Sequence, residues 1–127
     1  MKILTCCAGG NWRSHHLALL LKDFYHHDAI ALGLATVSGQ DTRRMLFEWA
    51  DLIVLTTDEV NHGHVPPEFA SKTVLWDVGP DTFNHPPSRE LYAKHIAFLD
   101  ANAAVVGQPV PEHVNVVNDL RHWDGIS

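Results

Sequence analysis

Short apolar runs and helix-like spacings alternate along this chain. Residues 2–7, KILTCC, form a run with strand character near the amino terminus. Residues 29–35 are apolar apart from Gly33, and residues 51–56, DLIVLT, make the clearest run of all. Runs of this length, bounded by turn residues, are typical of strands that are covered on both faces in a parallel sheet. Residues 73–76 predict a fourth, shorter strand.

Helical patterns fill the intervals between these runs. Leu17, Leu20 and Leu21 repeat at i, i+3 and i+4, which predicts a helix that starts at Ser14 and ends near residues 26–27. The other predicted helices are residues 41–49 with Asp41 as the cap, a short helix after residues 57–58, and residues 88–102. Loops are expected around the Pro66-Pro67 pair and over residues 79–87.

Strands that alternate with helices predict an α/β fold with a parallel sheet. With 127 residues, 46% of them hydrophobic, the chain is long enough for one compact domain and too short for two. We expect that domain to span residues 1–102. Residues 103–127 contain two prolines and little periodicity, so we expect an irregular C-terminal tail that packs on the domain or extends it.

The charge balance limits the partners. Nine Lys and Arg residues stand against fifteen Asp and Glu residues, a net charge of −6, so a broad basic surface for nucleic acid is excluded. No apolar stretch approaches the ~20 residues that span a bilayer, and the first residues lack the pattern of a signal peptide. We expect a cytoplasmic protein with neither nucleic-acid nor membrane partners. Its two cysteines are adjacent and cannot serve as a disulfide framework.

The segment between the first strand and the first helix, C-A-G-G-N-W-R-S at residues 7–14, has the composition of an anion-binding loop. Anions bind where a strand ends and a helix begins, since the first N–H groups of the helix lack partners. Two glycines allow the intervening N–H groups to turn inward. The residues expected to bind phosphate are Ala8, Gly9, Gly10, Asn11, Trp12, Arg13 and Ser14.

Three side chains of this loop suggest chemistry. A thiol at a helix N-terminus and next to a cation ionises more readily than a free thiol, so Cys7 is the candidate nucleophile. Arg13 has a planar fork of donors that fits two phosphoryl oxygens. The Ser14 hydroxyl is placed to donate a hydrogen bond to the thiolate.

A C-x5-R-[ST] signature directly after an amino-terminal strand resembles the low-molecular-weight protein tyrosine phosphatase family. The likeness extends over residues 2–102, because T-D-E-V-N at residues 57–61 and D-T-F at residues 81–83 are similar to the family's later motifs. It implies a three-layer fold with a four-stranded parallel sheet in the order 2-1-3-4. Trp12 stands where the family has a second loop cysteine, so the intraloop disulfide is missing.

The resemblance also implies an activity. Similar proteins hydrolyse phosphate monoesters, above all phosphotyrosine, through a cysteinyl-phosphate and without a metal or cofactor. Carried over to this chain, Cys7 is the nucleophile, Arg13 holds the phosphoryl group and Asp81 is the general acid, with Asp77 as its rival. Trp12 and Phe83 are the candidates to stack on an aryl phosphate. The expected partners are a phosphorylated protein or a small phosphate monoester, and inorganic phosphate as product.

Other functions remain open at this point. The same loop would suit a phosphate-binding module with little or no turnover, or a phosphocarrier like the IIB components of sugar transport systems, which also begin with a strand and Cys-x-x-Gly. Phosphoserine or phosphothreonine are possible substrates. The ten histidines include adjacent pairs, which on a helix point some 100° apart and therefore favour surface positions over a metal site.

Overall fold

The computed structural model describes residues 1–8, 12–34, 39–58, 64–79 and 89–121. Its centre is a four-stranded parallel sheet in the order β2-β1-β3-β4, so the expected fold class and strand order are confirmed. The strands are β1 (Lys2–Cys7), β2 (Asp28–Gly33), β3 (Leu52–Leu55) and β4 (Thr73–Leu75).

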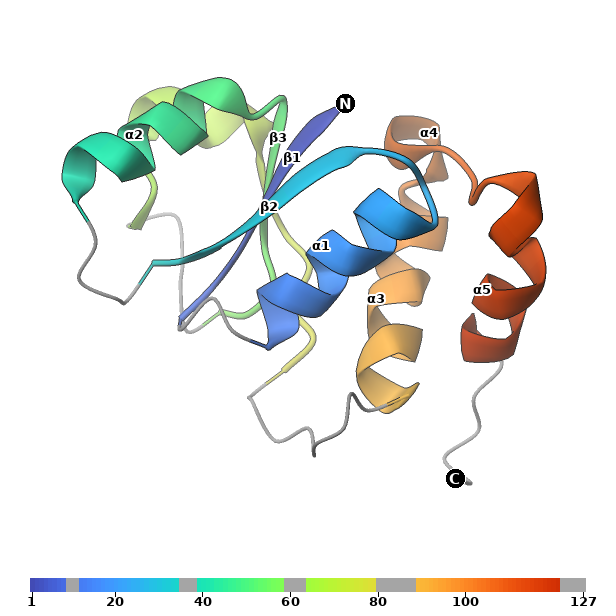
Figure 1. The fold of residues 1–127 in the computed structure, drawn as a ribbon. Helices are drawn as coiled ribbons and strands as arrows, with labels where there is room; N and C mark the ends of the chain where they lie inside the picture. The colour runs from blue at the N-terminus through green and yellow to red at the C-terminus, as the bar shows by residue number, and fades with distance from the viewer. Residues whose placement is uncertain (9–11, 35–38, 59–63, 80–88, 122–127) are drawn as a thin grey trace.

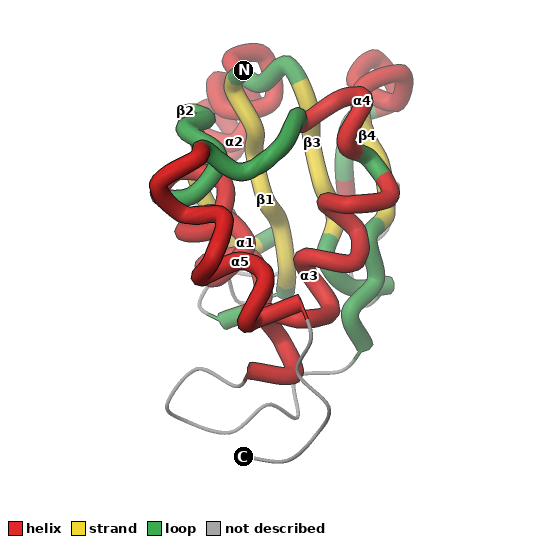
Figure 2. Tube along the Cα trace, turned by 90° about the vertical axis from the view of Figure 1, so that its right-hand side faces the viewer, coloured by secondary structure: helices red, strands yellow, loops and turns green. Residues whose placement is uncertain are grey.

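Helices cover both faces of this sheet (Figure 1). Those with α geometry are α1 (Arg13–Asp23), α2 (Gln40–Trp49), α3 (Arg89–Ala101), α4 (Ala103–Val106) and α5 (Val114–Arg121), and the 3-10 helices are η2 (Pro67–Lys72) and η3 (Pro111–His113). The helices α1, α3 and α5 lie on one face and α2 lies on the other (Figure 1). Figure 2 shows the strands running between these two layers. No helix within the described ranges combines the length and the apolar character needed to cross a membrane.

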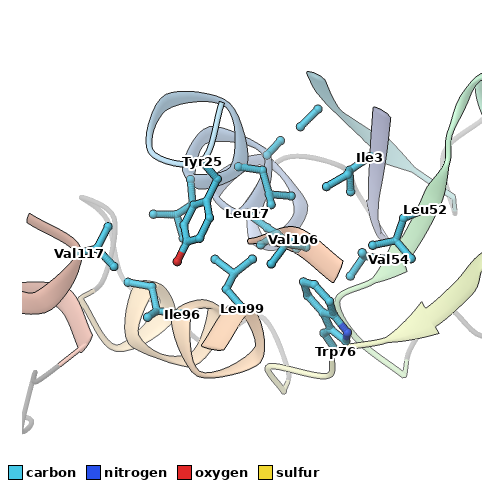
Figure 3. Close-up of a cluster of buried hydrophobic side chains, with 14 residues drawn as sticks. Ile3, Leu17, Tyr25, Leu52, Val54, Trp76, Ile96, Leu99, Val106 and Val117 are labelled. Atoms are coloured by element: carbon cyan, nitrogen blue, oxygen red, sulfur yellow. The ribbon is translucent and has the colours of Figure 1, made fainter. Parts of the chain in front are cut away.

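Successive residues of each strand point to opposite faces, and this alternation divides the interior into two cores. Ile3 belongs to the core under α1 and α3, together with Leu17, Trp76 and Leu99 (Figure 3). Leu4 belongs to the core under α2. The central strands β1 and β3 are buried on both faces apart from Lys2, which requires the continuous apolar sequence that predicted them. The edge strands β2 and β4 are partly exposed, with Ile30 and Leu75 among their exposed residues.

Helix limits differ slightly from the expectation. The first helix begins at Arg13 and ends at Asp23, several residues before the predicted end. The N-cap residue of α2 is Gly39 rather than Asp41, which lies in the first turn of the helix. The short helix expected after residues 57–58 falls on residues 59–63, outside the described part of the chain.

The segment before β4 is a 3-10 helix, η2, where the sequence predicted a loop. Pro67 occupies its first position, where a missing N–H costs nothing and a fixed φ favours the helical turn. Phe69 is buried in the core under α2, and its ring lies 5.7 Å from that of Phe47. Burial of this aromatic side chain, together with the hydrogen bond from Lys72 to the oxygen of Ala50, attaches the segment to the α2 side of the sheet.

The expectation of an irregular tail is wrong for residues 103–121, which form α4, η3 and α5. Val117 is fully buried against the core under α1 and α3. Arg121 donates to both carboxylate oxygens of Asp100 on α3, at 2.7 and 2.9 Å. The tail therefore continues the helical layer, and the division at residue 102 remains a prediction.

Candidate active site

The candidate site lies at the carboxyl edge of the sheet, where β1 ends at Cys7. Strand alternation places Cys6 in the core under α2 and turns Cys7 toward α1. The Sγ atom of Cys7 lies 3.1 Å from Oγ of Ser14, in the first turn of α1. Burial raises the pKa of the Cys6 thiol, whose side chain is fully enclosed, so this thiol stays protonated near pH 7.

Two hydrogen bonds hold the ends of the loop in place. The Thr5 hydroxyl donates to the backbone oxygen of Ser14 at 2.7 Å, and both residues are fully buried. The N–H of Leu34, just after β2, donates to the backbone oxygen of Cys7 at 2.9 Å. The distance between the thiol and the start of α1 is thus set by buried groups on two neighbouring strands.

Arg13 links the loop to the segment that follows β4. Its side chain is 3% exposed, and Nη1 donates to the backbone oxygen of Gly79 at 3.0 Å. Gly79 has φ +91°, a conformation that glycine adopts far more readily than other residues. The Gly79 N–H donates to Oδ1 of Asp77 at 2.8 Å, so the Asp77 carboxylate shapes this turn.

His95 supports the start of α1 from the opposite helix. This residue of α3 is fully buried, and its Nε2 donates to the backbone oxygen of Arg13 at 2.9 Å. Since a carbonyl can only accept, Nε2 carries a proton, and the low pKa of this buried group leaves the imidazole neutral near pH 7. Burial is the main cause that lowers the pKa of His95 from 6.5 to about 3; the hydrogen bond to Arg13 opposes this shift, and the charge of nearby His16 adds to it.

Trp12, the residue before α1, packs on the helix. Its ring meets His16 edge to face, with 4.5 Å between centroids, and His16 in turn meets Tyr92 of α3 at 5.4 Å. The His16 Nδ1 donates to the backbone oxygen of Trp12 at 2.6 Å. These contacts fix the last loop residue against the layer of α1 and α3.

The structure brings together four of the predicted site residues: Cys7, Trp12, Arg13 and Ser14. Ala8 packs at the edge of the core under α2. The remaining predicted residues lie outside the described part of the chain, and they are Gly9, Gly10, Asn11, Asp81 and Phe83.

Sequence reasoning missed the residues that support the loop. Thr5 is the one hydroxyl residue in an apolar strand, two positions before Cys7, and that polar position was a usable signal. His95 lies on the line of Leu91 and Leu99 at i and i+4 spacing, so its burial was also open to inference. Its partner, Arg13, was not, because the two residues are 82 positions apart.

The arrangement is suited to bind an oxyanion beside a sulfur nucleophile. The amino end of α1 offers N–H groups without helical partners and the positive end of the helix dipole. Arg13 adds a full positive charge directly at that end. Among the described residues, the side-chain group able to hold a metal ion lies elsewhere, at the far end of α1.

Comparison with known proteins supports the architecture. No protein-family model and no curated protein matches the chain. Among solved structures, the YwlE arginine phosphatase from Geobacillus stearothermophilus is similar, with a TM-score of 0.56 and 17% sequence identity. The match covers 98% of this chain and 99% of that one. The resemblance inferred from the sequence therefore holds at the level of structure: the chain has the fold of the low-molecular-weight protein tyrosine phosphatases.

Proposed function

We propose that this protein is a cysteine-dependent phosphatase that hydrolyses phosphate monoesters, with aryl phosphates such as phosphotyrosine as substrates. The observation that carries the proposal is the Sγ atom of Cys7 at 3.1 Å from Oγ of Ser14, where β1 gives way to α1. Arg13 directly precedes Ser14 in the first turn of α1, and its buried guanidinium donates to the oxygen of Gly79. A nucleophile, a hydroxyl donor and a fixed cation thus meet at a helix N-terminus.

In the first step the Cys7 thiolate attacks phosphorus, and a P–S bond forms as the P–O bond to the leaving group breaks. Ser14 donates a hydrogen bond that stabilises the thiolate, both before attack and when sulfur leaves again in the second step. Arg13 and the amino end of α1 stabilise the charge on the non-bridging oxygens of the transition state. Water then cleaves the cysteinyl-phosphate and releases inorganic phosphate.

We assign the general acid to Asp81, which gives a proton to the leaving oxygen and later takes one from the attacking water. The hydrogen bond from Gly79 to the Asp77 carboxylate favours this choice over Asp77, because it gives Asp77 a structural part in the turn. Replacement of Asp81 by asparagine should lower kcat for phosphotyrosine by about 10²–10⁴. The loss for p-nitrophenyl phosphate should be smaller, since that leaving group needs little protonation.

A second substrate class follows from the structural comparison. The similar solved structure is an arginine phosphatase, and phosphoarginine holds its phosphoryl group through a P–N bond. The proposed thiolate attack can break either a P–O or a P–N bond. The two substrates differ in the leaving atom, but the phosphoryl group that the thiolate attacks is the same. Phosphotyrosine, phosphoarginine, phosphoserine and phosphothreonine peptides therefore belong in one assay panel, in which kcat/KM ranks the classes.

The central test compares p-nitrophenyl phosphate hydrolysis by the wild type, Cys7→Ser and Cys6→Ala. Cys7→Ser should abolish turnover and retain phosphate binding, whereas Cys6→Ala removes the adjacent buried thiol and should retain turnover. Hydrolysis by Cys7→Ser at the wild-type rate would refute the mechanism.

Two other outcomes would identify a different function. If the wild type binds phosphate in the loop after Cys7 but does not hydrolyse p-nitrophenyl phosphate, the protein is a binding module. A phosphocysteine that persists for hours and passes its phosphoryl group to another acceptor would indicate a phosphocarrier.

A further inference from the structure

A cluster of three metal-ligating side chains lies at the end of α1 that is remote from the loop. It consists of His26, Glu112 and His113, and one ligand atom from each lies within 4.8 Å of those of the other two. The helix α1 has 11 residues, so at 1.5 Å per residue its far end is about 16 Å from Arg13. Nothing in the proposed phosphatase chemistry uses these side chains.

His26 reaches the cluster through an uncommon backbone conformation. Its φ is +55°, and it is the one non-glycine residue with positive φ in the described part of the chain. This left-handed conformation costs a residue with a side chain about 1–2 kcal/mol. It ends the turn between α1 and β2 and brings His26 Nε2 to 3.9 Å from Oε1 of Glu112.

The two segments that supply the ligands are tied together by the backbone. The N–H of Val110 donates to the oxygen of Phe24 at 2.8 Å, which joins the stretch before η3 to the turn after α1 (Figure 1). The ring of His113 also lies 5.1 Å from that of Phe24. The neighbouring His27 is engaged elsewhere, as its Nε2 lies 2.7 Å from the oxygen of Val106. Contacts within the protein therefore hold the two ligand-bearing segments together before any ion binds.

The donor set indicates the kind of ion. Two imidazoles and one carboxylate are typical ligands of zinc and similar divalent transition metals, while calcium and magnesium prefer oxygen ligands alone. At 3.9 Å the His26–Glu112 pair is too long for a hydrogen bond, so the carboxylate is not committed to the imidazole. The two side chains are 57% and 68% exposed, which leaves them free to rotate inward by the ~1 Å that metal–ligand bonds of about 2.0–2.2 Å require.

We propose that His26, Glu112 and His113 bind one zinc-like divalent transition metal ion, with water in the fourth position, and that the ion clamps the turn between α1 and β2 to η3. The bound ion would join the start of the C-terminal helices to the body of the sheet domain. Because the site is at the far end of α1, it is independent of the loop and of whether the protein is a phosphatase.

Calorimetric titration of the full chain with zinc chloride tests the proposal. The protein should carry no histidine tag, and all samples should contain Cys7→Ser so that this thiol cannot bind the metal. We expect one zinc ion per chain with micromolar affinity, an upward shift of Tm with zinc, and no such shift with magnesium. The absence of binding at 100 equivalents of zinc would overturn the proposal.

Matched variants locate the ion. His26→Asn removes the imidazole and keeps a residue that tolerates positive φ, and Glu112→Gln removes the charge at constant size. Each should weaken zinc binding more than about tenfold. Loss of a residue that only hydrogen-bonds to a metal ligand already weakens metal binding by about 10–100-fold, and loss of a ligand itself should cost at least as much. The control His15→Asn removes an exposed histidine from the other end of α1 and should bind zinc like the parent. Equal affinity in all four proteins would refute the assignment.

Discussion

Replacement of His95 by glutamine should change how the free energy of unfolding varies with pH. His95 is fully buried and neutral, and burial lowers its pKa from 6.5 to about 3. Above pH 6.5 the imidazole is neutral in both the folded and the unfolded chain, so it adds no pH dependence. Between pH 6.5 and about 3 the unfolded chain binds a proton that the folded chain does not, so stability falls as the pH falls.

The size of this effect follows from the shift. Each pH unit below 6.5 removes about 1.4 kcal/mol from the free energy of unfolding until the folded protein is itself protonated. At pH 5 the loss is about 2 kcal/mol, a substantial part of the 5–15 kcal/mol that stabilises an ordinary domain. The His95→Gln variant has no side chain at this position that binds a proton between pH 7 and 3. Its amide can still donate to the oxygen of Arg13, and the altered packing lowers stability by an amount that does not depend on pH.

Urea unfolding of the wild type and His95→Gln at pH 7, 6 and 5 measures the effect. The stability advantage of the wild type over His95→Gln should shrink by about 2 kcal/mol between pH 7 and 5. His15→Gln, which removes an exposed histidine of α1, should follow the wild type at each pH. A constant difference between wild type and His95→Gln from pH 7 to 5 would refute the claim that the folded protein keeps His95 unprotonated.

The same position also tests the link between α3 and the loop. His95→Leu fills the buried position with an apolar side chain and loses the donor to the Arg13 oxygen, whereas His95→Gln retains a donor. If the bond positions the loop, phosphate affinity and kcat/KM should fall in His95→Leu and be largely restored in His95→Gln. Equal affinity in the two variants would assign His95 to packing alone.

Three further experiments, with five substitutions between them, have defined outcomes. Arg13→Lys replaces a planar fork by a point charge and, under the proposed function, should lower kcat by about 10²–10³ in p-nitrophenyl phosphate assays; unchanged kcat would remove Arg13 from the mechanism. Gly79→Ala and Gly107→Ala both place a side chain at positive φ, +91° and +80°, and each should cost about 1–3 kcal/mol in urea unfolding. Of the two, Gly79→Ala alone should weaken phosphate binding, because the oxygen of Gly79 accepts a hydrogen bond from Arg13. Leu99→Ala should lower the free energy of unfolding by about 2–5 kcal/mol, since this side chain is fully buried, whereas Val105→Ala, at a 50% exposed position, should change it by less than about 0.5 kcal/mol; similar losses in the two would contradict the packing of the core.

Much of the fold was determined by local sequence. Four apolar runs separated by helical spacings define a parallel sheet, because strands buried on both faces need continuous apolar side chains. The order of Cys7, two glycines, Arg13 and Ser14 predicted an anion loop, because the end of a strand and the start of a helix leave backbone N–H groups free to bind an anion. These features depend on residues close in sequence, so their pattern is visible without a structure.

Only the tertiary structure decided what surrounds that loop. The contacts of Arg13 with Gly79 and His95 span 66 and 82 positions, and no local pattern encodes which helix packs beside which strand. The C-terminal segment reads as irregular by itself, because a helix of only 8 residues, α5, is marginal in water and forms here through burial of Val117 and the ion pair to Asp100. The sequence by itself specified the strands and predicted an anion loop after the first of them. Packing between residues far apart in the chain specified what supports β1 and α1, and it brought His26 beside Glu112 and His113.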